Sequence, residues 1–384
     1  MTIQELHSNE ELRQHEFPVT RKTIFLGHAG VCPLPRRVAD AMNRYNDQCT
    51  LGDQEQSLPP DFFSSIREKA CRLINAKPEE IAFVGPTSLA LSFIAGGLKF
   101  RRTDNVLIYQ DDYPSNVYPW MTLADRGVQV RYLNVKQFGQ IRLTDIKGQI
   151  DENTRLVALA SCHFLAGYRI ELDAIGKYLR ERGILFCVDG IQTIGAFPTN
   201  AANVDFMAAD AHKWMLGPCA AGLMYVRKEI QDHLLPTTQG WHNIRCPNFV
   251  AQEQLNYRTD ARRYEAGTAN LVGLAGLGAA LDLLLEIGIE NIATELLRKR
   301  AWIVPELRAK GYEVIQADSA PANQGGMISF RKPGADLAAL YLKLKDDGIL
   351  TSLRGDRSGR KLLRISPHFY NTDAELKRLL ELLP

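Results

Sequence analysis

Short runs of apolar, often β-branched residues recur along the first two thirds of the chain, and stretches with helical spacing lie between them. Leu172, Ile175 and Leu179, for example, form one apolar stripe that predicts a helix. Strands that alternate with helices predict a mainly parallel sheet covered by helices on both faces. The predicted strands are residues 81–84, 105–110, 128–133, 156–161, 185–189, 206–209 and 222–226.

The pattern changes after Gly267, and a long helix is predicted to begin near Asn270. Three later apolar runs predict a small sheet flanked by helices: residues 327–330, 349–353 and 362–365. We therefore expect an α/β chain whose large domain, residues 20–262, holds a mainly parallel seven-stranded sheet between helices. Residues 1–19 and 263–384 are expected to form a smaller α+β domain. A length of 384 residues agrees with two domains.

The balance of charged residues argues against two kinds of binding partner. The net charge is +2, from 46 basic and 44 acidic residues, and a nucleic-acid or membrane-surface partner would favour a concentrated basic field instead. One basic cluster exists, and most of it is interpreted as a solvated loop: Arg354, Arg357, Arg360, Lys361 and Arg364. The long apolar stretch 271–297 is interrupted by three acidic residues, which predicts a packed helix and not a membrane span.

Residues 1–16 lack the basic start and apolar core of a signal peptide. Seven cysteines, an odd number without a C-x-x-C pair, predict reduced thiols in a cytoplasmic enzyme. The eight histidines form no H-E-x-x-H pattern, so no metal site is predicted.

The candidate chemistry follows the predicted strands, because ligands of an open parallel sheet bind beyond the carboxyl ends of its strands. Thr87 and Ser88 follow the first strand and precede a helical stretch. Hydroxyls beside the free N–H groups and the dipole of a helix start favour a bound phosphate. Taken alone, the same residues also fit an ordinary helix N-cap.

Two other strand ends carry an aromatic ring and a carboxylate. Tyr113 follows the second strand, where its ring fits either simple packing or stacking on a ligand. Asp189 ends a buried strand and precedes Gln192. A carboxylate in this place needs a cation or a strong donor, such as a protonated pyridine nitrogen, unless it only caps a helix.

Lys213 stands between the end of strand 206–209 and a Gly-Pro turn, after Asp210 and His212. Most lysines are solvated surface charges. The apolar residues 214–216 predict instead a desolvated amine, which forms Schiff bases readily. All these strand ends meet at one edge of the sheet, so they predict a single site.

In these motifs and their order the chain resembles the class V aminotransferase family. This family of fold-type I pyridoxal-phosphate enzymes includes cysteine desulfurases, kynureninase and isopenicillin N epimerase. The similarity covers nearly the whole chain, and its Asp-x-x-Gln and His-Lys-Trp elements are highly specific. The matching motifs are 25–30 (FLGHAG), 113–120 (YPSNVYPW), 188–192 (VDGIQ), 212–218 (HKWMLGP), 264–268 (YEAGT) and 363–368 (LRISPH).

The resemblance implies a role for each matching residue. Pyridoxal phosphate would be bound as a Schiff base (an internal aldimine) on Lys213, which would also move protons at the substrate α-carbon. Asp189 would pair with the pyridinium nitrogen so that the ring accepts electrons. Gln192 would bind the phenolic oxygen, and Tyr113 would stack on the ring. The remaining cofactor-binding residues would be Thr87, Ser88 and His212 at the phosphate, Asp210 beside them, and Thr268 from the neighbouring subunit of a homodimer.

The same resemblance implies a substrate side. Arg364 would bind the carboxylate of a small amino acid, because its planar guanidinium suits bidentate pairing. His28 and Ala29 belong to the motif that resembles the family's N-terminal substrate-side loop. Further candidate contacts with the substrate side chain are Trp241, His242 and Arg245.

Two features depart from the family pattern. Many members carry a cofactor-contacting asparagine after the strand 156–161, where this chain has Phe164, so either Gln192 acts alone or His163 contributes. Desulfurases carry a cysteine shortly before the carboxylate-binding arginine, but residues 351–364 contain none. Without that nucleophile a persulfide-forming desulfurase is disfavoured. Three cysteines that approach the site are interpreted as packing residues: Cys32, Cys162 and Cys219.

The leading hypothesis is a pyridoxal-phosphate enzyme of the aminotransferase type that acts at the α-carbon of a small amino acid. The alternatives are a lyase that eliminates a β-substituent, for example by breaking a C–S bond, and an amino-acid epimerase; fold analogy does not rank them. A cofactor-binding protein without activity is disfavoured, because Lys213, Asp189 and Arg364 are all present.

Overall fold

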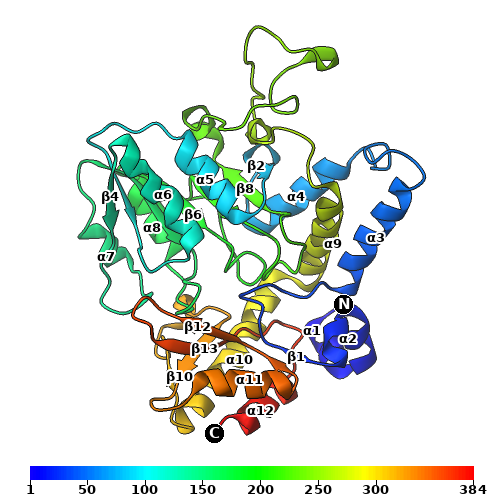
Figure 1. Cartoon of the computed structure of the whole chain (residues 1–384), viewed down its shortest axis with the longest axis vertical. Coiled ribbons are helices and arrows are strands. Elements are labelled where there is room, and N and C mark those ends of the chain that lie inside the picture. Colours follow the sequence, from blue (N-terminus) through cyan, green and yellow to red (C-terminus); the bar gives the residue numbers. More distant parts are fainter.

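A seven-stranded sheet forms the centre of the larger part of the computed structural model, which describes residues 1–384 (Figure 1). Its strands are β2 (Ile81–Phe83), β3 (Asn105–Ile108), β4 (Gln129–Tyr132), β5 (Thr154–Ala160), β6 (Leu185–Asp189), β7 (Phe206–Ala209) and β8 (Leu223–Val226). They lie side by side in the order β2-β8-β7-β6-β5-β3-β4. All seven predicted strands are confirmed, with small differences at their ends.

The sheet is mainly parallel, as expected. The strands from β4 to β7 run parallel to their neighbours, whereas β8 is antiparallel to both β7 and β2. Asp189, at the end of β6, pairs with Ala160 of β5 and with Ala208 of β7. These three strands therefore end at one level, which brings the segments after them to the same edge of the sheet.

Helices cover both faces of this sheet. Successive side chains of a strand point to opposite faces, so Cys187 packs with α5 (Thr87–Gly97) and α6 (Tyr118–Met121) on one face. Phe186 and Val188 pack on the other face. That face is covered by α4 (Phe62–Ile74), α7 (Leu143–Lys147), α8 (Leu172–Arg180) and α9 (Leu271–Ile287), with α3 (Arg36–Cys49) against α9.

An antiparallel sheet forms the core of the smaller part, at the bottom of Figure 1. Its strands are β9 (Glu313–Val314), β10 (Ile328–Arg331), β12 (Ser352–Gly355) and β13 (Lys361–Ile365), in the order β12-β13-β10-β9. Apolar residues of this sheet pack with α10 (Ile289–Ala309), α11 (Leu337–Asp346) and α12 (Asp373–Leu382). The predicted small sheet flanked by helices is confirmed.

The chain passes between the two parts more than once. After α1 (Ile3–Ser8) and α2 (Glu10–Glu16), strand β1 (Ile24–Phe25) pairs with β11 (Ile349–Leu350) of the smaller part. In contrast, α9 packs on α3 and α4 of the larger part, although its residues follow position 263. The division at residues 19 and 262 stays a prediction.

The apolar stretch 271–297 forms two helices, which corrects the expectation of one. α9 begins next to Asn270, as predicted, and Asn270 caps it, because its Oδ1 accepts a hydrogen bond of 3.0 Å from the Gly273 N–H. Gly288, with a φ of +87°, ends this helix, and α10 continues at an angle of 74°. No single helix has the length and apolarity needed to cross a membrane, although this bent pair together meets that test.

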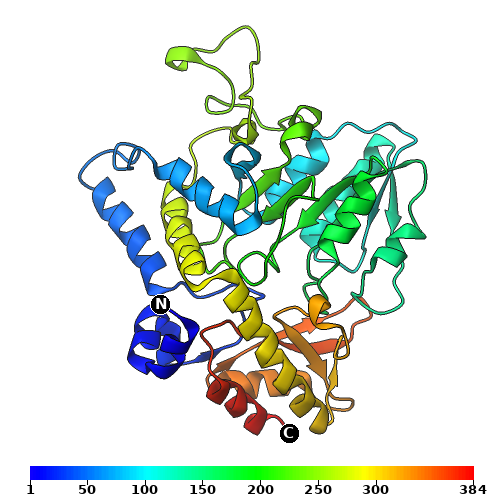
Figure 2. The ribbon, with the colours of Figure 1, turned by 180° about the vertical axis from the view of Figure 1, so that it is seen from behind.

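Between β8 and α9 the chain leaves the body as a long loop (yellow-green in Figures 1 and 2). Its residues Trp241 and Phe249 are exposed, and their rings meet edge to face at 5.6 Å. This loop carries the residues that the sequence suggested as contacts with the substrate side chain.

Candidate active site

A cavity of about 320 Å³ opens at the carboxyl ends of β6 and β7, with the hairpin β12–β13 on its other side. Most of the residues predicted for the site line it. The lining residues are Ala29, Gly30, Val31, Pro86, Thr87, Ser88, Tyr113, Ser115, Phe164, Asp189, Ile191, Gln192, His212, Lys213, Arg354 and Arg364.

Lys213 follows β7, and only 7% of its surface is exposed. Burial lowers the pKa of its amine to about 8; Asp189 opposes this effect, and Arg364 adds to it. The Nζ atom lies 5.2 Å from the centre of the Tyr113 ring. Near neutral pH about a tenth of Lys213 is therefore a neutral amine, the form that attacks carbonyl carbons, which is far more than for an exposed lysine.

Asp189 ends β6 and is 3% exposed. Its Oδ1 accepts a hydrogen bond of 3.0 Å from the Ile191 N–H. Burial, together with the buried Asp112 nearby, raises the pKa of this carboxyl to about 6. A cation placed against Asp189 would favour its ionised form, so the site fits a protonated ring nitrogen.

Trp214 fixes the orientation of Gln192. The indole Nε1–H is only a donor, and it lies 2.8 Å from Gln192 Oε1, which identifies that atom as the amide oxygen. The Gln192 amide nitrogen donates to the Ala29 carbonyl at 3.2 Å. Its second N–H remains free, so Gln192 offers a donor to the cavity and not an acceptor.

Thr87 and Ser88 lie in the first turn of α5, as the sequence suggested. The Asp210 N–H donates to Thr87 Oγ1 at 2.8 Å, which leaves the hydroxyl proton of Thr87 free to bind an anion. His212 Nδ1 lies 2.8 Å from Asp210 Oδ2. Asp210 itself is outside the lining and holds the His212 ring, whose other edge reaches the cavity. These groups suit a phosphate at a helix N-terminus.

Arg364, on β13, is 1% exposed and has free donors. Its Nη1 donates to the Phe164 carbonyl at 2.6 Å, but its Nε and Nη2 have no hydrogen-bond partner. Burial and the neighbouring Arg354 lower its pKa to about 9. Buried unpartnered donors are costly, and a carboxylate in the cavity would satisfy both atoms.

Phe164, and not His163, faces the cavity. The Phe164 ring meets the Tyr113 ring edge to face at 5.4 Å. Both ring nitrogens of His163 are bonded to backbone: Nε2 to the Asp111 carbonyl at 2.9 Å and Nδ1 to the Ala166 N–H at 2.9 Å. Burial lowers the pKa of His163 to about 4, so this residue is a neutral structural group.

The comparisons with known proteins agree with this geometry. Residues 24–379 match the family model "Aminotransferase class-V". The chain belongs to the class V aminotransferase family. It is 29% identical to a probable cysteine desulfurase of Methanothermobacter thermautotrophicus, over 97% of both chains. It is 28% identical to the uncharacterized aminotransferase YcbU of Bacillus subtilis, over 98% of this chain and 97% of that protein.

A solved structure shares the fold of this class V chain. The apo cysteine desulfurase of Thermococcus onnurineus superimposes with a TM-score of 0.87 at 25% identity, over 96% of this chain and 95% of that one. The fold is therefore that of a fold-type I enzyme. Members of the family use pyridoxal phosphate. The unpartnered donors of Arg364, the buried Asp189 and the hydroxyls of α5 fit this cofactor and an amino acid.

The structure corrects the expectation for His28. Its side chain is fully buried and does not line the cavity. Nδ1 bonds to the Ser366 carbonyl at 2.9 Å and Nε2 to the Tyr370 hydroxyl at 2.8 Å, which leaves nothing for a substrate. Ala29, the next residue, does line the cavity.

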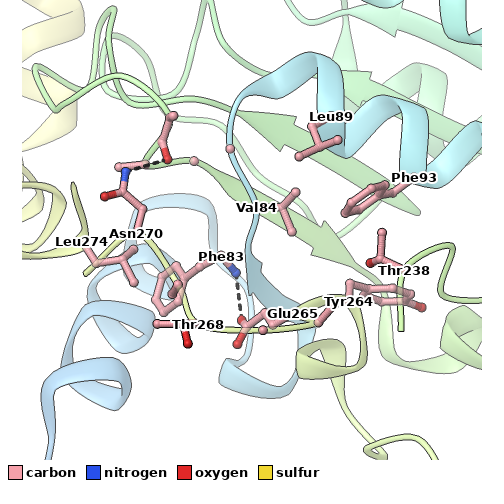
Figure 3. Close-up of a pocket in the computed structure, with 17 residues that line it drawn as sticks. Phe83, Val84, Leu89, Phe93, Thr238, Tyr264, Glu265, Thr268, Asn270 and Leu274 are labelled. Atoms are coloured by element: carbon pink, nitrogen blue, oxygen red, sulfur yellow. Dashed lines mark hydrogen bonds between the residues drawn. The ribbon is translucent and has the colours of Figure 1, made fainter. Parts of the chain in front are cut away.

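Other predicted contacts lie elsewhere in the chain. Thr268 lines a separate pocket with Phe83 and Glu265 (Figure 3). There the Phe83 N–H donates to Glu265 at 2.9 Å. Trp241 and Arg245 line a third hollow on the projecting loop. Within one chain, none of these residues lines the cavity of Lys213.

Arg354 is the lining residue that sequence reasoning missed, because it was assigned to a solvated loop. Ser352 of β12 pairs with Arg364 of β13, and Arg354 pairs with Leu362. Side chains two residues apart on a strand share a face, so this register places both arginines on the same side. A predicted hairpin with its turn near residues 356–360 would have placed Arg354 beside Arg364.

Proposed function

We propose that this chain is a pyridoxal-phosphate enzyme that acts at the α-carbon of a small α-amino acid. The observation that carries the proposal is one cavity with a desolvated amine, Lys213, beside a buried guanidinium with free donors, Arg364. The first is suited to a carbonyl group and the second to a carboxylate. The cofactor, when bound, supplies an aldehyde and a ring that accepts electrons from the α-carbon.

Each polar side chain of the cavity would have one role in binding or in proton transfer. Thr87, Ser88 and His212 would hold the phosphate. Asp189 would keep the ring nitrogen protonated, and the free N–H of Gln192 would bind the phenolic oxygen. Arg364 would hold the substrate carboxylate, and the Lys213 amine would take the proton from the α-carbon and return it. Phe164 and Tyr113 would exclude water from this proton transfer.

The leading form of the reaction is amino-group transfer, in which Lys213 moves the proton to another carbon of the same complex. Elimination of a β-substituent, for example by breaking a C–S bond, is the second candidate; the relatives named as cysteine desulfurases also remove sulfur from an amino acid, although by name they are not lyases. Persulfide formation is disfavoured because no cysteine lines the cavity. Cys32 is buried, and burial raises the pKa of its thiol to about 12, so it is not a thiolate nucleophile.

We also propose a homodimer in which Thr268 reaches the phosphate of the partner. The pocket that holds Thr268 opens to the surface beside Phe93 and the exposed Leu89 (Figure 3). A second copy on this face would cover that apolar surface. Sedimentation should give the mass of a dimer, and a Thr268→Ala variant should bind the cofactor more weakly. A monomer with full cofactor affinity would contradict this part of the proposal.

A panel of amino acids, each incubated with the holoenzyme with and without a keto acid, tests the reaction. A new amino acid that forms only with the keto acid indicates transfer. Pyruvate with ammonia or sulfide indicates elimination, and a change of optical configuration alone indicates epimerisation. If no amino acid changes the absorbance of the bound cofactor, the proposal is wrong.

A further inference from the structure

A second guanidinium faces the cavity next to Arg364. Arg354 lines the same cavity as Lys213, and the register of the hairpin places its side chain on the same face as Arg364. A Cβ atom placed on Gly30 would lie 3.7 Å from Arg354 Nη2 and 3.8 Å from Arg364 Nη2. The ends of the two side chains therefore flank one point beside the substrate-side loop.

Arg354 has no partner within the chain, unlike the two arginines at the turn of its hairpin. At the turn, Arg357 pairs with Asp111 at 2.7 Å, and Arg360 pairs with Asp356 at 2.8 Å. Arg354 makes no ion pair and no side-chain hydrogen bond. Its charge also lowers the pKa of Arg364, so the two cations repel each other. No acidic side chain of the chain pairs with Arg354. A positive charge without a partner inside the protein is available to bind an anion.

Arg364 can bind one carboxylate without help from Arg354. The free Nε and Nη2 of Arg364 already form a complete fork for the α-carboxylate of an amino acid. Asp189 is the one acidic side chain in the lining, and it faces the ring nitrogen in the proposed function. Arg354 is thus left without a counterion after the α-carboxylate has bound.

The two arginines also differ in depth. Arg364 is 1% exposed, whereas Arg354 is an exposed residue of β12. A ligand that contacts both extends from the buried end of the cavity towards its mouth. In an amino acid, the group that points away from the α-carboxylate is the end of the side chain.

We propose that the substrate is an amino acid with a second carboxylate at the end of its side chain, and that Arg354 binds this group. The inference rests on the proposed function of the cavity. It names Arg354 as the residue that determines substrate specificity, while Arg364 binds what all α-amino acids share.

Equilibrium titration of the holoenzyme, followed by the absorbance of the bound cofactor, tests this proposal. The ligands are two acids, aspartate and glutamate, and their neutral amides, asparagine and glutamine. We expect the better acid to bind about tenfold or more tightly than its amide, since a charge-assisted hydrogen bond is lost in the amide. Equal affinities of acid and amide for the wild-type enzyme overturn the proposal without any variant.

Arg354→Gln should remove this preference, because the affinity for the acids should fall much more than the affinity for the amides. The control is Arg357→Gln, because Arg357 lies on the same hairpin but outside the cavity, and it should keep the preference. A preference that survives in Arg354→Gln overturns the proposal. So does an equal loss of affinity for acids, amides and alanine, which would mean that both arginines bind the α-carboxylate. Binding of the amides shows that the proposed function still holds even if this inference fails.

Discussion

The two sides of the cavity differ in how their polar groups are satisfied. On the side of the large sheet, Asp189, Gln192 and Asp210 are all held by hydrogen bonds within the chain. On the side of the hairpin β12–β13, Arg354 has no partner, and Arg364 keeps two free donors. A cofactor that stays bound can be held by groups whose positions are already fixed by hydrogen bonds. A substrate binds and leaves, so it must itself bring the acceptor for donors that lack one. The comparison therefore separates a cofactor side from a substrate side.

Replacing Lys213 by alanine is expected to have the largest effect on the cofactor side. Loss of the amine that moves the α-proton should lower turnover by about 10⁴-fold. Borohydride should no longer fix the cofactor to the protein, as measured by absorbance and peptide mapping. Lys299 is the matched control, because burial lowers its pKa to about 8 as well, but it lies outside the cavity. A cofactor fixed to Lys299 would show that burial alone, and not the cavity, selects the lysine.

Replacing Arg364 by alanine should affect mainly the substrate side. Loss of the charged fork should weaken amino-acid binding about 30- to 100-fold. Cofactor affinity should change much less, through the higher pKa that Lys213 has without the neighbouring charge. Titration of the holoenzyme with amino acids measures the affinity for the substrate. Titration of the apoenzyme with cofactor measures the affinity for the cofactor. Arg331→Ala, in the same small sheet but paired with Glu313 at 2.7 Å, is the control. If both affinities fell together, the two sides would not be separate.

The pH dependence of cofactor uptake tests the desolvated amine. Burial lowers the pKa of Lys213 to about 8 from the ordinary value of 10.5. The neutral amine is the reactive form, so the uptake rate should rise about tenfold per pH unit up to pH 8 and then level off. An unburied lysine would continue to gain rate up to about pH 10. Arg354→Gln should move the break to higher pH, because Arg354 contributes to the lowered pKa.

Trp214→Phe should have the smallest effect. The variant removes the N–H that orients Gln192, so the amide can turn and present its oxygen to the cavity. The loss of one neutral hydrogen bond should lower kcat/KM about 3- to 10-fold and shift the absorbance maximum of the bound cofactor. Trp120→Phe is the control, because its indole bonds to Asn116 away from the cavity. Equal spectra for the two variants would show that Trp214 only packs.

The cofactor side could be predicted from the sequence for a simple physical reason. Parallel strands of one sheet end at a common edge, so residues after successive strands meet without any knowledge of the packing. Thr87, Tyr113, Asp189 and Lys213 come together in this way.

The substrate side depends on packing between distant segments, which no local pattern encodes. Arg354 faces the cavity because of the hairpin register, and His28 turns away because Ser366 and Tyr370 bind both of its ring nitrogens. The break at Gly288 between α9 and α10 also escaped prediction, since the apolar pattern continues across it.

The hairpin β12–β13 contributes both arginines and none of the residues that hold the cofactor. It is a short, contiguous segment, and its turn is anchored to the larger part of the molecule by Arg357 and Asp111. On the proposed function, mutations confined to it would change the choice of amino acid and leave in place the side chains that hold the cofactor. For a lineage that acquires new substrates, this hairpin is a unit that can be inherited, exchanged and selected separately from the chemistry beneath it.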